Sequence, residues 1–204
     1  MIEEIESEIE ILEEGLGLIV AEPQVRDILS ELEELHMRRG SHFIWQLKVI
    51  ASHPSFSPVE NETNIFSTGG ESGEDYENLL NAARKAVEHG YRVFILPNPQ
   101  GIRTADFIFE RKGVYKLFDL KTISGKNSVG NRLRESIGQT NRVLINLTVD
   151  YNPRQLAISI RQYFEKNSEA LEVMIIKGGK IISVIREDVM GTSFIKYFMM
   201  KYTK

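Results

Sequence analysis

Residues 104–122 read TADFIFERKGVYKLFDLKT, and they predict the central hairpin of the protein. Apolar residues dominate on both sides of Arg111-Lys112-Gly113, which predicts two strands, at 104–110 and 114–122, joined in a hairpin. If Lys112-Gly113 is a two-residue loop, Asp106 lies directly opposite Asp119. Their Cβ atoms are then about 4.5–5.5 Å apart.

The two faces of this hairpin differ in character. Side chains alternate between the faces of a strand, so Lys121 shares the face of Asp119. A register shift of one residue would make Asp106 and Asp119 diagonal neighbours instead. We expect the opposite face to form half of a core, because it carries Phe107, Phe109, Phe118 and Leu120.

Two carboxylates opposed in a sheet repel each other and destabilise it unless something neutralises them. A divalent cation, Mg²⁺ or Mn²⁺ with Zn²⁺ as an alternative, would do so, because such ions are held by carboxylates, waters and substrate phosphate. Lys121 would then stabilise charge on a phosphate or position an attacking water. The other interpretation is a surface ion pair between Asp119 and Lys121, with Asp106 merely at a strand end.

Outward from the hairpin, helical and strand patterns alternate. Ser72 and Asp75 form an N-cap signature for a helix that Gly90 closes. The other predicted elements are a strand at 91–96, a helix at 130–141, a strand at 143–149, a helix at 152–166, a hairpin at 172–185 and a helix at 188–202. This order predicts an α/β fold in which helices flank a mixed sheet.

Further candidate residues lie on the helices beside the hairpin. Glu77, in the first turns of the helix from Ser72, could reach the metal, although acids there also suit the positive end of the helix dipole. The segment after the hairpin is basic, and its side chains could grip a phosphate backbone or hydrogen-bond the substrate. These substrate-binding candidates are Lys126, Arg132, Arg134, Gln139 and Arg142.

The first 71 residues read differently from the rest. Apolar residues at helical spacing predict helices at 2–14, from Pro23 onward, and at 43–50. Serine, proline, asparagine and glycine dominate after residue 52, with little apolar content. We therefore expect a helical N-terminal region at 1–51, a linker at 52–71 and an α/β domain at 72–204.

Composition excludes several classes of protein. The chain of 204 residues has no cysteine, which excludes disulfide frameworks, thiolate metal sites and a cysteine nucleophile.

The net charge of −4 is unevenly distributed along the chain. Residues 1–35 hold twelve acids and one base, whereas residues 101–167 hold six acids and twelve bases. Such a basic region is a candidate nucleic-acid surface. No apolar run could span a bilayer, and the acidic N-terminus fits no signal peptide.

The ordered set of motifs resembles the core of the PD-(D/E)XK nucleases, the restriction-endonuclease-like fold. More narrowly, it resembles the C-terminal nuclease domains of contact-dependent growth inhibition and related polymorphic toxins. The resemblance covers about residues 72–187, although Ala105 stands where the family has proline. The stretches that carry it are Tyr76-Glu77-Asn78, residues 89–93, Ala105-Asp106-Phe107-Ile108-Phe109, Phe118-Asp119-Leu120-Lys121-Thr122, residues 138–147 and the hairpin at 172–185.

The resemblance implies a metal-dependent endonuclease acting on tRNA or DNA. Asp106 and Asp119 would bind the metal with help from Glu77, and Lys121 would be the catalytic lysine. It also implies a cognate immunity protein as a partner. We expect a cytoplasmic site of action, with delivery into another cell only as part of a larger system.

Two other functions are compatible with the sequence. A metal-independent toxin ribonuclease would use His89 and the region of Thr122 and Ser124. Alternatively, the chain is a non-catalytic nucleic-acid-binding or phage-associated module whose nuclease core is vestigial. Activity in a chelator would favour the first, and absence of metal binding the second.

Overall fold

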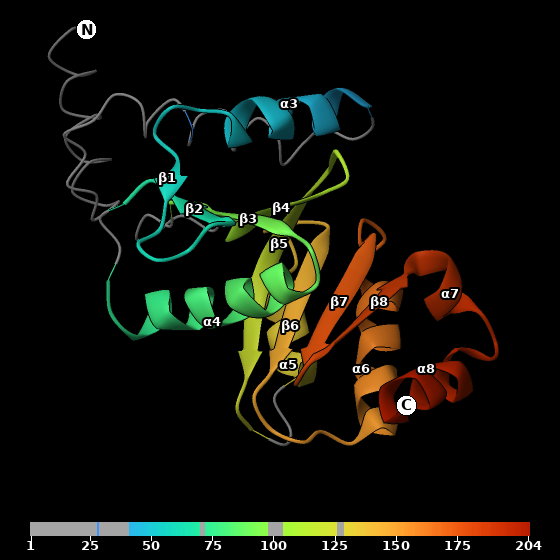
Figure 1. The fold of residues 1–204 in the computed structure, drawn as a ribbon. Coiled ribbons are helices and arrows are strands. Elements are labelled where there is room, and N and C mark those ends of the chain that lie inside the picture. The colour runs from blue at the N-terminus through green and yellow to red at the C-terminus, as the bar shows by residue number, and fades with distance from the viewer. Residues whose placement is uncertain (1–27, 29–40, 70–71, 98–103, 126–128) are drawn as a thin grey trace, which may run out of the picture.

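The computed structural model describes residues 28, 41–69, 72–97, 104–125 and 129–204. In these residues, eight strands form one mixed sheet whose spatial order follows the chain, from β1 to β8 (Figure 1). The strands are β1 (Ser57–Pro58), β2 (Ile65–Ser67), β3 (Arg92–Ile95), β4 (Phe107–Arg111), β5 (Val114–Ile123), β6 (Arg142–Leu147), β7 (Glu172–Lys177) and β8 (Lys180–Ile185). The helices are α3 (Ser41–Ala51), α4 (Glu74–Glu88), α5 (Val129–Glu135), α6 (Pro153–Lys166), α7 (Arg186–Met190) and α8 (Phe194–Thr203).

The central hairpin of β4 and β5 has the predicted register. The pairs run from Arg111 opposite Val114 to Phe107 opposite Phe118. Lys112 and Gly113 have φ angles of 53° and 77°, as a primed two-residue turn requires. From β5 onward the strands run parallel through β6 to β7, and β8 closes the sheet in an antiparallel hairpin.

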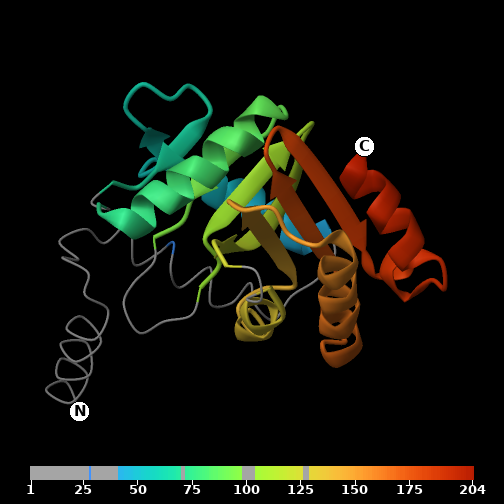
Figure 2. The same cartoon turned by 90° about the horizontal axis from the view of Figure 1, so that it is seen from below.

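Helices cover both faces of the sheet (Figure 2). On one face, α4 packs over the predicted aromatic set of β4 and β5, with Phe107, Phe109 and Phe118 fully buried. On the other face lie two clusters. One joins α3 to β3, β4 and β5, and the other joins α5, α6 and α8 to β6, β7 and β8. The predicted α/β architecture is confirmed, and it is consistent with a restriction-endonuclease-like fold.

Several helix boundaries differ from the predictions. The N-cap of α4 is Gly73 rather than Ser72. The helix predicted at 130–141 ends at Glu135, and a turn follows in which Gly138 has a φ of 90°. The helix predicted at 188–202 is two helices, α7 and α8, because the backbone of Gly191 is extended. In contrast, Asn152 caps α6, and its side chain accepts hydrogen bonds from two backbone amides.

The region predicted as a linker contributes to the sheet. Within 52–71, β1 pairs with β2, and β2 pairs in parallel with β3. Ile65 is fully buried in the cluster under α4. These residues are therefore part of the folded core, while the division of the chain into domains stays a prediction. The helices predicted at 2–14 and from Pro23 lie outside the described residues, apart from Ile28, which is buried against α3.

Among the described residues, no helix is long and apolar enough to cross a bilayer.

Candidate active site

Asp119 and Lys121 form a buried ion pair in the middle of β5. The Lys121 Nζ lies 2.8 Å from both carboxylate oxygens of Asp119. The Asp119 side chain is 2% exposed and that of Lys121 is 13% exposed. Residues 117 and 123 on the same face belong to the α3 cluster and to the α5–α6 cluster, respectively. The pair therefore lies where these two apolar clusters meet, and it is not a surface ion pair.

Asp106 lies one residue before β4 begins, and the ladder does not extend to it. Its backbone amide donates to the carbonyl of Phe118 over 2.9 Å. The prediction that Asp106 lies directly opposite Asp119 in the ladder is therefore wrong. Instead, the Asp106 carboxylate turns toward β5 and accepts a hydrogen bond of 2.6 Å from the amide of Leu120. Backbone groups of Phe118 and Leu120, the two neighbours of Asp119, therefore hold Asp106 in place.

The carboxyl groups of Asp106 and Asp119 nevertheless lie together, close enough to share a hydrogen bond. Burial and, to a smaller extent, the negative charge of Asp119 raise the pKa of Asp106 to about 7. The Leu120 amide and the Lys121 ammonium act in the opposite direction. Two carboxyl groups and an amine are therefore gathered at one point of the sheet, where near neutral pH the carboxyl pair tends to retain one proton.

The donor set is suited to a hard divalent cation. Carboxylate oxygens are the ligands that Mg²⁺ and Mn²⁺ prefer, and such ions often take only one or two from the protein. The raised pKa of Asp106 means that an added positive charge beside the pair would be favourable. The fit is poorer for Zn²⁺, which is commonly bound through histidine or cysteine, because the described residues contain no cluster of three or more metal-binding side chains.

Glu77 is not brought to the two aspartates. It is exposed in the first turns of α4, on the opposite side of the sheet from Asp119. Its charge helps to raise the pKa of Arg84, about two turns further along the same helix. No third acid joins Asp106 and Asp119 among the described residues, so the predicted assisting role of Glu77 lacks structural support.

Arg142 is engaged in a different buried cluster. Its Nε lies 3.3 Å from a carboxylate oxygen of Glu172, and Lys116 Nζ lies 2.7 Å from the same oxygen. Ser183 donates to the other oxygen over 2.5 Å. Glu172 is 3% exposed. This cluster joins four strands under the α4 face, so Arg142 serves the fold and points away from the aspartates.

The other basic candidates lie around α5. Arg132 is exposed and pairs with Glu135 at 3.1 Å. Arg134 is exposed and contacts the carbonyl of Gly130 and the side chain of Asn131. Gln139, in the turn after α5, donates to the carbonyl of Glu135 over 3.0 Å. Lys126 lies outside the described residues.

The candidates for a metal-independent ribonuclease do not form one site. His89 is the C-cap of α4 and lines a cavity with Lys180 and Lys201 beside β8. Thr122 lies on β5 opposite Asn146 of β6, and Ser124 is exposed just beyond β5. Neither of these two lines the cavity of His89.

One functional candidate, Tyr163 of α6, was missed in the sequence. Its side chain is 2% exposed, and its hydroxyl accepts a hydrogen bond from Asn167 over 3.2 Å. Burial raises the pKa of its phenol, and the charge of Asp119 adds to this effect. A tyrosine on an apolar helical stripe gives no sign in the sequence that it lies near a carboxylate on a distant strand.

Comparison with protein families supports the toxin relationship that the sequence suggests. Residues 103–181 match the family model described as the contact-dependent growth inhibition CdiA C-terminal domain. The matched range includes Asp106, Asp119 and Lys121 together with α5 and α6. Comparison with curated proteins and with solved structures found no match.

Proposed function

We propose that this chain is a metal-dependent endonuclease of the toxin type that hydrolyses phosphodiester bonds in tRNA or DNA. The observation that carries the proposal is the buried group of Asp106, Asp119 and Lys121, two carboxyl groups close enough to share a hydrogen bond beside an ammonium. The match over residues 103–181 favours the same conclusion, because it spans this group.

Each of the three residues has a separate task in the proposal. Asp106 and Asp119 would hold Mg²⁺ or Mn²⁺. Such an ion, when bound, lowers the pKa of water and neutralises negative charge on the phosphate. Asp119 also orients the ammonium of Lys121 through two contacts of 2.8 Å. Lys121 would donate to a non-bridging phosphate oxygen and stabilise the charge that grows there during hydrolysis.

The surroundings of the carboxylates support a polyanionic substrate. Residues 101–167 hold twice as many bases as acids, and Arg132 and Arg134 are exposed on α5, directly after β5 in the chain. Phosphate contacts of this kind position nucleic acid without reading its sequence. By the family match, we also propose a cognate immunity protein that neutralises the activity in the producing cell.

The proposal is tested by incubating the purified chain with total tRNA, single-stranded DNA and double-stranded DNA. Each substrate is offered with Mg²⁺, Mn²⁺, Zn²⁺ or a chelator, and the products are resolved on denaturing gels. We expect cleavage of one substrate class with Mg²⁺ or Mn²⁺ and none in the chelator. Full activity in the chelator would instead establish a metal-independent ribonuclease.

A calorimetric titration separates an enzyme from a vestigial nuclease core. We expect Mn²⁺ to bind the wild-type chain and to bind the Asp106→Asn variant much more weakly, because one of two carboxylate ligands is lost. Asp150→Asn is the matched control, since this side chain is 98% exposed and lies outside the site. The absence of Mn²⁺ binding to the wild-type chain would favour the non-catalytic module.

A further inference from the structure

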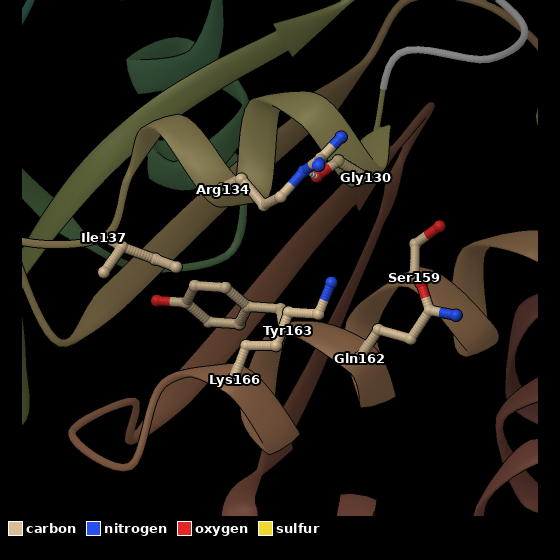
Figure 3. Close-up of a pocket in the computed structure, with 7 residues that line it drawn as sticks. All are labelled: Gly130, Arg134, Ile137, Ser159, Gln162, Tyr163 and Lys166. Atoms are coloured by element: carbon tan, nitrogen blue, oxygen red, sulfur yellow. Dashed lines mark hydrogen bonds between the residues drawn. The ribbon is translucent and has the colours of Figure 1, made fainter.

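A pocket lies between α5 and α6, separate from the carboxyl pair (Figure 3). Its volume is about 180 Å³. Helix α5 and the turn after it contribute one side, and α6 contributes the other side from its middle to its C-terminal end. The lining residues are Gly130, Arg134, Ile137, Ser159, Gln162, Tyr163 and Lys166.

The lining of this pocket is cationic and carries no carboxylate. Arg134 and Lys166 provide two positive charges from opposite helices, and Ser159 and Gln162 add neutral hydrogen-bonding groups. The hydrogen bonds of Arg134 go to neutral acceptors, the Gly130 carbonyl and the Asn131 side chain. Arg132 and Arg142, in contrast, are each paired with a glutamate. The charge of Arg134 is therefore not offset by an acid within the pocket.

A glycine of α5 faces a serine of α6 at the edge of this pocket. A Cβ added at Gly130 would lie 3.7 Å from the Ser159 hydroxyl, so a larger side chain would begin to fill the space between α5 and α6. Gly130 lies in the first turn of α5, the helix that follows β5, the strand of Asp119 and Lys121.

Tyr163 connects the pocket with the carboxyl pair. Its ring lines the pocket beside Ile137, as Figure 3 shows. The same residue is close enough to Asp119 for the carboxylate to influence its phenol. Helices α5 and α6 also cover the face of the sheet that bears Asp119 and Lys121. The pocket and the carboxyl pair therefore lie on the same side of the sheet, where one nucleic-acid backbone could contact both.

We propose that the α5–α6 pocket binds a phosphate group of the nucleic-acid substrate at a distance from the phosphate that is cleaved. This inference rests on the proposed nuclease function and assigns a second contact to the same substrate. Arg134 and Lys166 hold the phosphate oxygens from two sides, and Gln162 and Ser159 hydrogen-bond the phosphate or the adjoining sugar. The pocket supplies affinity and position, whereas the carboxyl pair and Lys121 supply the chemistry.

The test compares nucleic-acid binding by charge variants in a chelator, where the proposed cleavage does not proceed. Binding of a fluorescein-labelled tRNA and of a labelled single-stranded oligonucleotide is followed by anisotropy at several salt concentrations. We expect Arg134→Gln/Lys166→Gln to weaken binding at least tenfold and to lower the slope of log affinity against log salt by about 0.7, since one phosphate contact on a single strand is lost. Both side chains are exposed, so the variant should fold.

Two controls separate the pocket from general surface charge. Arg154→Gln removes a charge from the exposed N-terminal end of α6, outside the pocket, and should change the affinity much less. Arg134→Lys/Lys166→Arg keeps both charges and should retain the salt slope. Under cleavage conditions the Gln double variant should raise KM with little change in kcat.

Equal losses in the double variant and in Arg154→Gln would overturn the pocket assignment, as would wild-type affinity in the double variant. Either result would leave the proposed nuclease function intact if the wild-type chain cleaves in Mg²⁺. Conversely, a wild-type chain that binds through the pocket without cleaving any substrate would overturn the nuclease function and keep the binding site.

Discussion

Replacing Asp106 with asparagine should change how the stability of the fold depends on pH. In the folded protein, burial and the neighbouring Asp119 raise the pKa of Asp106 to about 7, from an ordinary value of 3.8. Between these two values the folded state holds a proton that the unfolded chain has released. The free energy of unfolding therefore falls as pH rises from about 4 to 7, and the loss is complete above pH 7.

The size of the effect follows from the pKa difference. A difference of about 3 pKa units at about 1.36 kcal/mol per unit gives a full loss of about 4 kcal/mol. About 3 kcal/mol of this loss falls between pH 5 and pH 8, where the measurement is convenient. Asparagine has no proton to lose and can still accept the hydrogen bond from the Leu120 amide, so Asp106→Asn should lack this part of the pH dependence.

The assay is urea unfolding at pH 5 and pH 8 in a chelator, followed by circular dichroism. Between these two pH values, the wild-type chain should lose about 3 kcal/mol more stability than Asp106→Asn. Asp150→Asn, which removes a carboxylate that is 98% exposed, should behave as the wild type does. If the free energy of unfolding depends on pH equally in the wild type and in Asp106→Asn, the pKa of Asp106 is not raised in the folded protein.

Three further predictions concern the scaffold and are measured by urea or thermal unfolding. Glu172→Gln should lower the free energy of unfolding by about 3 kcal/mol, because it leaves the cations of Lys116 and Arg142 without their shared carboxylate. A decrease below about 1 kcal/mol would mean that this cluster contributes little to stability. Asn152→Ala should cost about 1 kcal/mol through loss of the α6 cap, and an unchanged midpoint would count against the cap. Gly113→Ala should cost about 1 kcal/mol because its φ is 77°, and a gain in stability would contradict the turn assignment.

The central hairpin was predictable because its information is local. The turn at Lys112-Gly113 fixes the register, and the register fixes which face each aromatic residue takes. The end of the ladder was not predictable. The backbone amide of Asp106 donates to the carbonyl of Phe118, and the Asp106 carboxylate accepts from the amide of Leu120. These hydrogen bonds involve backbone groups, which the pattern of side chains in the sequence does not reveal.

Other features required contacts that are distant in the sequence. Strands β1 and β2 have only two and three residues, and among serine, proline and asparagine they resemble a linker until β3 is placed beside them. Arg142 appears in the sequence as a free cation at the start of a strand. Only the parallel pairing of β6 with β7 brings it to Glu172, in a buried cluster on the α4 face of the sheet.

The most direct test of the central claim is the single-turnover cleavage rate of Asp119→Asn in Mg²⁺, measured beside the wild type on the substrate that the wild type cleaves. The substitution keeps the size of the buried side chain and removes the charge that orients Lys121. We expect the rate to fall at least about 100-fold, with a circular dichroism spectrum like that of the wild type. Cleavage at the wild-type rate by a folded Asp119→Asn chain would mean that Asp119 takes no part in hydrolysis.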